Sequence, residues 1–126
     1  MTGSGVATEA RALRLGKDRV LTRVDFFTRP GSRMRGLLGR PKPEEGHAVL
    51  LRPCGSVHTF FMRYPIDIVF LDDEDRIVRV VPSLAPWRMA AGGIRARQTL
   101  ELPSGRIAPE RWREGDRVDW ESIPGL

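Results

Sequence analysis

Apolar and charged residues alternate along most of this chain, and a period of two residues is typical of half-buried β-strands. Residues 11–29 read RALRLGKDRVLTRVDFFTR, with the turn sequence Gly16-Lys17-Asp18 between the two apolar runs. This pattern predicts two short strands joined by a tight turn. Residues 1–9 are small and polar, so we expect them to form a flexible N-terminal tail.

The same pattern predicts further strands towards the C-terminus. Residues 66–81 read IDIVFLDDEDRIVRVV, which predicts a hairpin with its acidic turn at 72–75. The segments 47–53, 58–63 and 99–107 are three more strand candidates, and a Gly115-Asp116 turn precedes a last one. Proline limits these strands, since Pro65 ends the strand at 58–63 and Pro82 ends the hairpin.

One segment has helical spacing. Met34, Leu37 and Leu38 lie three and four residues apart, Ser32 can cap the first turn, and Gly39 with Pro41 ends the pattern. We therefore expect a short helix over about residues 31–39. The irregular segment 83–98 is long for a loop inside a compact domain, which is typical of functional or mobile segments.

These elements predict an α+β fold that is mainly β, a small closed or partly closed β-barrel-like domain of about six or seven short strands with one short helix. A length of 126 residues suits one domain with its own core. We place that domain at residues 10–121 and a C-terminal tail at 122–126. Closure would protect the edge strands of so small a sheet.

Charge and cysteine content exclude few classes of function. The net charge of +5 comes almost wholly from arginine, since Lys17 and Lys42 are the only lysines. Arginine spread over a surface is usually solvated, and an anionic or nucleic-acid partner would require clustering such as that in 29–40 and 106–117. One cysteine, Cys54, excludes an internal disulfide. No segment is apolar enough to span a membrane or resembles an export signal, so we expect a cytoplasmic protein.

Charged residues inside apolar strands are the candidates for chemistry. Asp67 shares a strand face with Val69 and Leu71, and a carboxylate there needs partners because an unpaired buried charge is costly. It either accepts backbone hydrogen bonds after Pro65 or takes a ligand-binding or acid-base role. Glu101, between Leu100 and Leu102, faces either solvent or a polar pocket.

Three further residues have open interpretations. His58 is either a half-buried strand histidine or a catalytic base. Trp87, within the long irregular segment, either plugs the barrel mouth or offers a stacking surface to a ligand. Cys54 lies four residues before His58, a separation of about 13 Å in extended chain, which makes a nucleophile-base pair weak. The histidines, cysteine and carboxylates show no metal-ligand spacing, so no metal or cofactor is predicted.

Five fragments in this order resemble one protein family: RMRGLLGR at 33–40, HTFFMRYPIDIVFLD at 58–72, RIVRVVPSLAPW at 76–87, LELPSG at 100–105 and GDRV at 115–118. They are similar to the DUF192 family of uncharacterised bacterial and archaeal proteins. The resemblance covers about residues 21–120 and implies one small β-rich α+β domain. It implies family positions at Arg33, Gly36, Met62, Arg63, Asp67, Pro86 and Glu101, and it supplies no established activity.

Our leading hypothesis is a non-catalytic binding or accessory protein for a small anionic or polar ligand. Its pocket would be lined by Arg33, His58, Arg63, Asp67, Trp87 and Glu101. The first alternative is a hydrolase that uses Asp67 or Glu101 with His58 as acid and base. The second is nucleic-acid binding through the arginine-rich surface. The ligand, the oligomeric state and the pathway stay open at this stage.

Overall fold

The structure is a computed structural model that describes residues 7–28, 37 and 40–126. The described residues form nine β-strands: β1 (Glu9–Leu15), β2 (Asp18–Phe27), β3 (His47–Leu51), β4 (Ser56–His58), β5 (Ile66–Leu71), β6 (Ile77–Leu84), β7 (Met89–Ala91), β8 (Gln98–Pro103) and β9 (Asp119–Ser122). The mainly-β prediction is therefore confirmed.

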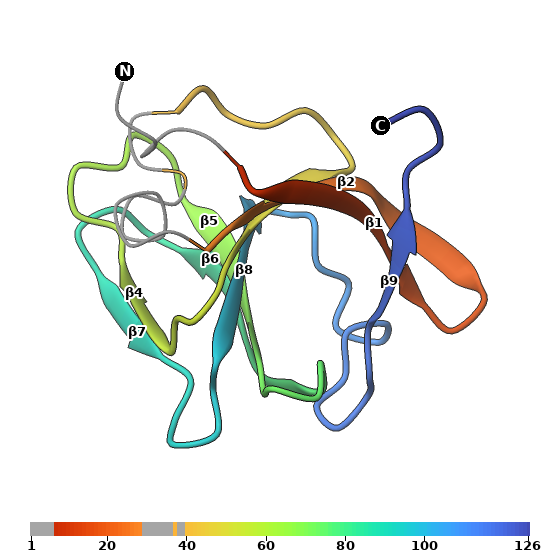
Figure 1. Ribbon diagram of the computed structural model, residues 1–126. Coiled ribbons are helices and arrows are strands. Elements are labelled where there is room, and N and C mark those ends of the chain that lie inside the picture. Colours follow the sequence, from red (N-terminus) through yellow and green to blue (C-terminus); the bar gives the residue numbers. More distant parts are fainter. Residues whose placement is uncertain (1–6, 29–36, 38–39) are drawn as a thin grey trace.

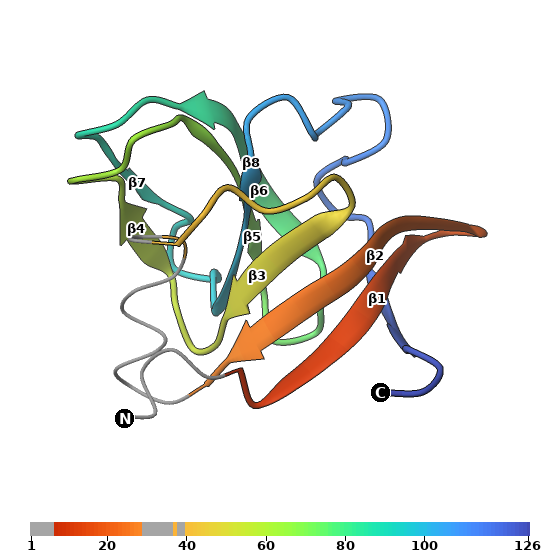
Figure 2. The same ribbon diagram turned by 90° about the horizontal axis from the view of Figure 1, so that it is seen from above.

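Seven strands form one sheet in the order β6-β5-β8-β3-β2-β1-β9, and β4 and β7 form a separate two-stranded sheet. The β2–β3 pair is parallel, and the other pairs are antiparallel. In both views the small sheet lies at the opposite side of the molecule from β9 (Figures 1 and 2). Strands distant in sequence, β8 and β3, thus become neighbours at the centre of the large sheet.

The sequence predicts a closed or partly closed barrel, and the closed form is wrong, because the large sheet has two edges, β6 and β9. These ends approach each other only where Arg76 forms an isolated bridge with Arg117. The Ile77 N–H donates to Asp116 O at 2.8 Å, and the Val118 N–H donates to Asp75 O at 2.9 Å. Since β9 itself pairs with β1, only the turn before it reaches β6, and the sheet curls without closing.

The described residues contain no helix, and hence none that could cross a membrane. The helix predicted over about 31–39 lies outside the described residues, apart from Leu37. The strand predicted over 58–63 is corrected: β4 ends at His58, and a turn begins after Thr59. The Met62 N–H donates to Thr59 O at 3.1 Å, so the chain reverses here instead of continuing extended.

The other strand predictions are confirmed with small shifts of their ends. β1 and β2 form the first predicted hairpin, and β5 and β6 form the second. The candidates at 47–53 and 99–107 appear as β3 and β8. The segment 83–98, predicted to be irregular, contains β7, which pairs with β4.

Two hydrophobic clusters cover opposite faces of the central strands. Val69 and Leu71 of β5 point into one cluster, while Ile66, Ile68 and Phe70 point into the other. All six residues of β5 are buried, and so are all six of β8. A polar side chain on either strand is therefore inside the protein whichever face it takes, and it must find its hydrogen bonds there.

Gly92 allows β7 and its following turn to approach β5. A Cβ atom at Gly92 would lie 2.5 Å from the Cγ of Phe70 and 2.5 Å from the Cβ of Ala96. We expect Gly92→Ala to lower the free energy of unfolding by about 1–3 kcal/mol, because both neighbours must shift. Chemical denaturation measures this difference. The exposed control Ala91→Ser should change it by less than about 0.5 kcal/mol, and equal stabilities of the two variants would contradict the packing.

Candidate functional site

Asp67 is a buried carboxylate that holds three segments together. Its Oδ1 accepts a hydrogen bond from the Ser83 N–H at 2.7 Å. Its Oδ2 accepts from the N–H groups of Arg106 at 2.8 Å and Ile107 at 3.2 Å. The side chain is 1% exposed. Both oxygens are thus occupied by backbone donors, which matches the interpretation of Asp67 as a carboxylate that accepts backbone amides.

Glu101 is buried on β8 and accepts a hydrogen bond from a loop segment. Its Oε1 accepts a hydrogen bond from the Leu37 N–H at 2.9 Å. Burial raises the pKa of the Glu101 carboxyl to about 7, although the Leu37 hydrogen bond and the nearby Arg40 guanidinium both lower it. The Glu101 charge in turn contributes to raising the pKa of Tyr64, after desolvation. Glu101 therefore lies close to both Arg40 and Tyr64.

The register between β5 and β8 separates these two carboxylates. Asp67 pairs with Leu102, and Ile68 pairs with Glu101. Directly paired residues of antiparallel strands share a face, so Asp67 and Glu101 point to opposite faces of the sheet. The sequence predicts one pocket lined by both carboxylates. This arrangement rules that pocket out, because the two side chains lie on opposite faces of the sheet.

His58 and Trp87 lie on the surface, in a row of aromatic rings. The His58 ring stacks on Phe60 with centroids 4.8 Å apart, and Phe60 stacks on Trp87 at 5.8 Å. Trp87 also contacts Phe61 at 4.6 Å. We call His58, Phe60, Phe61 and Trp87 the aromatic cluster. His58 Nδ1 accepts from the Phe60 N–H, and His58 makes no hydrogen bond to Asp67 or Glu101.

Thr59 holds this region in place. Its hydroxyl donates to Ala85 O at 2.6 Å and accepts from the Arg88 N–H at 2.9 Å. Its backbone N–H donates to Arg88 O at 2.8 Å, and its carbonyl accepts from the Trp87 N–H at 2.9 Å. Thr59 is fully buried. These bonds fasten the turn after β4 to the loop before β7.

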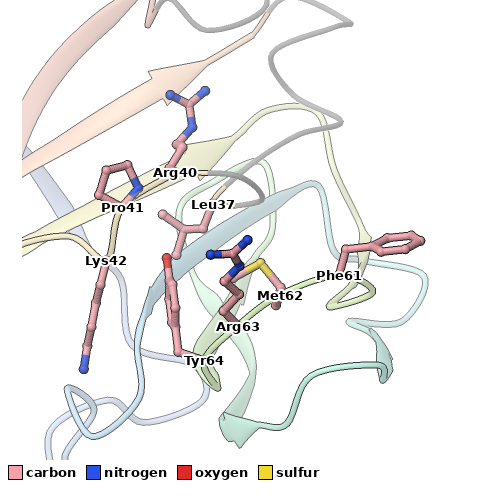
Figure 3. Close-up of a pocket in the computed structure, with 8 residues that line it drawn as sticks. All are labelled: Leu37, Arg40, Pro41, Lys42, Phe61, Met62, Arg63 and Tyr64. Carbon is pink, nitrogen blue, oxygen red and sulfur yellow. The ribbon is translucent and has the colours of Figure 1, made fainter.

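The basic pocket lies beside the same turn and has a volume of about 650 Å³. Its lining residues are Leu37, Arg40, Pro41, Lys42, Phe61, Met62, Arg63 and Tyr64. Figure 3 shows that they come from two parts of the chain, residues 37 and 40–42 and residues 61–64, and that Phe61 extends away from the others. Among the described lining residues, Arg40, Lys42 and Arg63 are cationic and none is acidic, and the Arg40 guanidinium lies over the Phe27 ring at 4.4 Å.

Several polar groups at this pocket lack protein partners within the described part of the chain. Neither Lys42 nor Arg63 forms an ion pair there, and both are exposed. The Tyr64 hydroxyl is buried and has no hydrogen-bond partner among the described residues. An acceptor group in the pocket would satisfy these donors, so the pocket is suited to an oxygen-rich or anionic ligand.

Of the five sequence-predicted site residues that the structure describes, only Arg63 lines the basic pocket. Trp87 borders it through its contact with Phe61, and Glu101 lies behind it. Asp67 lies on the other face of the sheet, His58 stacks on Phe60, and Arg33 lies outside the described residues.

Sequence reasoning missed Arg40, Lys42, Tyr64 and Thr59. The spacing Arg40-Pro41-Lys42 is a local signal for a basic, non-helical segment. Nothing local shows that it meets residues 61–64, because that contact depends on the order of strands in the sheet.

The remaining candidates are elsewhere in the molecule. Cys54 is half-buried, and its thiol donates to Ser56 O at 3.1 Å. Of the arginines in 106–117, Arg111 pairs with Asp18 and Arg113 with Asp116. The described residues contain no group of three or more histidine, cysteine or acidic side chains suited to a metal ion.

The sequence of this chain matches a known protein family. Residues 12–120 match the family DUF192, described as Uncharacterized ACR. The chain belongs to the DUF192 family. The resemblance inferred from the five sequence fragments is therefore confirmed, and the turn at 59–64 and strands β5 and β8 all lie inside the matched range.

Relatives with sequence similarity are UPF0127 proteins of archaea. One from Pyrococcus horikoshii is 40% identical over 65 residues, which is 52% of this chain and 56% of that protein. One from Pyrococcus abyssi is 35% identical over 81 residues, 60% of this chain and 68% of that protein. The chain thus spans little more than half the length of the first of these relatives.

A solved structure shares the fold. It is a protein of unknown function from Novosphingobium aromaticivorans, with a TM-score of 0.76 and 16% sequence identity. The similarity covers 95% of this DUF192 chain and 98% of the solved one. At that identity the likeness concerns the fold alone.

Replacing the Asp67 carboxylate should weaken the fold. In Asp67→Asn, an amide NH₂ group would face backbone donors that now bind a carboxylate oxygen. We expect the free energy of unfolding to fall by about 3 kcal/mol or more, since buried donors lose a charged acceptor. Urea denaturation measures the loss. Asp73→Asn, an exposed control on the acidic turn, should have almost no effect, and an equally stable Asp67→Asn protein would contradict this role.

Glu101 should make stability depend on pH. Its folded-state pKa of about 7 lies above the ordinary value of 4.5, so the folded protein holds the proton more tightly. The contribution is complete below pH 4.5 and is lost as pH rises through 7. The free energy of unfolding should fall by roughly 2–3 kcal/mol from pH 5 to 8, relative to Glu101→Gln.

Urea denaturation of both proteins across this pH range provides the measurement. Glu74→Gln removes an exposed carboxylate and is the matched control, expected to run parallel to the unmodified chain. Parallel curves for the unmodified chain and Glu101→Gln would show that Glu101 does not titrate in this range.

Proposed function

We propose that this protein binds a small anionic ligand in the basic pocket. The observation that carries the proposal is that Lys42 and Arg63 line this pocket, are exposed, and form no ion pair with the described residues. Positive side chains usually have negative neighbours within a protein. Two exposed cations that line one hollow favour an anion from outside the chain.

The shape of the pocket supports a small molecule. Its volume of about 650 Å³ lies within the usual range for ligand sites, roughly 300–1,000 Å³. Leu37, Met62 and Phe61 form apolar parts of the wall, which exclude water and strengthen contacts to charge. The Arg63 fork can bind two oxygens of a phosphate or carboxylate group, while Lys42 adds a single charge.

Binding without catalysis is the version of this function that the site favours. The pocket lining contains no histidine, cysteine or serine among the described residues, so no nucleophile with a base is present there. The hydrolase alternative requires His58 within hydrogen-bond reach of Asp67 or Glu101. His58 instead accepts the Phe60 N–H, and Asp67 binds three backbone N–H groups, so the geometry gives that alternative no support.

Nucleic-acid binding through the arginine surface stays a prediction. In the segment 106–117, Arg111 and Arg113 form ion pairs within the protein, which reduces the positive charge available there. Most of the segment 29–40 lies outside the described residues. No contact described in the structure favours a long polyanion over a small ligand.

Removal of one pocket cation tests the proposal. We expect the unmodified chain to bind inorganic phosphate, and Arg63→Gln or Lys42→Gln to weaken binding by about tenfold, because one charge-assisted contact is lost. Isothermal titration calorimetry at low ionic strength measures the dissociation constants. Arg95→Gln is the matched control, since it removes one exposed positive charge away from the pocket. Equal weakening in all three variants, or no phosphate binding by the unmodified chain, would refute the pocket as an anion site.

A further inference from the structure

The aromatic cluster exposes rings that proteins usually bury. Phe61 is 71% exposed and Trp87 is 54% exposed. Their ring centroids are 4.6 Å apart with an angle of 60° between the planes, so they form a tilted pair. Phe60 lies on the other side of Trp87 at 5.8 Å and nearly parallel, at 25°. Trp87 is thus supported by two phenyl rings and still open to solvent.

Both exposed rings stand on strained backbone. Phe61 has a φ of 67° and Trp87 a φ of 65°. Bulky side chains rarely adopt this left-handed region, where glycine or asparagine is usual. The hydrogen bonds of Thr59 to residues 87 and 88 hold the two segments in this state. This strained backbone keeps two apolar rings exposed to solvent instead of burying them. Such an arrangement indicates a role in ligand recognition.

Phe61 joins the aromatic cluster to the basic pocket. It lines the pocket with Arg63, two residues along the same turn, and it also contacts Trp87. In Figure 3 the Phe61 ring points away from the cationic side chains and forms the end of the lining. A flat apolar surface therefore continues directly from a wall that carries positive charge.

We infer that the ligand is an aromatic anion, a flat ring that carries a phosphate or carboxylate group. The inference rests on the proposed anion site and adds an aromatic part to the ligand that this site binds. The ring stacks on the Phe61–Trp87 surface, and the anionic group lies at Arg63, two residues along the same turn. Stacking is selective for planar π systems, while the cations recognise charge, so each half contributes separately.

Three probes of equal charge type separate these contributions: inorganic phosphate, phenyl phosphate and cyclohexyl phosphate. We expect phenyl phosphate to bind roughly tenfold tighter than inorganic phosphate, in line with aromatic stacking. Cyclohexyl phosphate has similar bulk without a flat ring and should bind clearly more weakly than phenyl phosphate. Calorimetry gives the constants, and the side-chain N–H signals of the three tryptophans in NMR spectra report the location.

Only the Trp87 signal should shift with phenyl phosphate, since Trp112 is buried in the core and Trp120 packs against it. Trp87→Phe identifies that signal by removing it. A shift of the other two signals alone would place the ring elsewhere and overturn the inference.

Asparagine variants remove the rings without adding strain, because asparagine tolerates positive φ. In Phe61→Asn and Trp87→Asn, we expect the ratio of phosphate to phenyl phosphate dissociation constants to fall from about ten to near one. Arg63→Gln should weaken both probes and keep the ratio. Met89→Ala removes another exposed apolar side chain, outside the cluster, and should also keep the ratio.

The outcomes separate the two proposals. If phosphate binds but phenyl phosphate binds no tighter, or cyclohexyl phosphate binds equally well, the aromatic half is wrong and the anion site stands. If neither phosphate nor phenyl phosphate binds, both are wrong. Thermal unfolding of the asparagine variants should stay within a few degrees of the unmodified chain, and the ratio is read only from folded protein.

Discussion

Burial of both faces of β5 and β8 constrains everything else in this structure. Every residue of these two strands is inside the protein, so a carboxylate on either one cannot reach bulk water. Asp67 accepts hydrogen bonds from three backbone N–H groups, and these bonds connect β5 to β6 and to the turn after β8. Glu101 accepts the Leu37 N–H, and desolvation raises the pKa of its carboxyl to about 7. The two faces of the sheet thus each hold one buried carboxylate, and burial raises the pKa of the one at Glu101.

The face that holds Glu101 is also the face covered by the segments of the basic pocket. Leu37 donates its N–H to Glu101 and lines the pocket, while Arg40 lies near enough to influence the carboxyl. The turn that supplies Met62, Arg63 and Tyr64 is fastened by Thr59 to the loop that carries Trp87. A buried hydrogen-bond network therefore positions exposed cationic and aromatic side chains. Binding residues are commonly found on loops that a rigid scaffold holds in place.

Membership of the DUF192 family and the shared fold account for the arrangement of the strands. They do not assign a function, which has to be inferred from the side chains of this protein. A fold can serve many activities, so the pocket has to be judged by its chemistry. That chemistry is positive charge beside flat aromatic surface. Both features come from short loop segments, while the strands beneath them carry the hydrophobic clusters.

The sequence alone determined which segments are extended and which faces of them are apolar, because alternation at a period of two is a local property. Both hairpins, β3, β8, and the placement of Asp67 with Val69 and Leu71 followed from it. Turns and pairings were harder: β4 stops at His58 because hydrogen bonds of Thr59 to a distant loop outweigh its local pattern.

Only the tertiary structure decided which side chains meet. The register of β5 against β8 sends Asp67 and Glu101 to opposite faces, and a shift of one residue would have reversed this. The same strand order brings Arg40 and Lys42 to Arg63 and Tyr64 across more than twenty residues of chain. Such contacts arise from summed packing of the whole sheet, so no local pattern of residues encodes them.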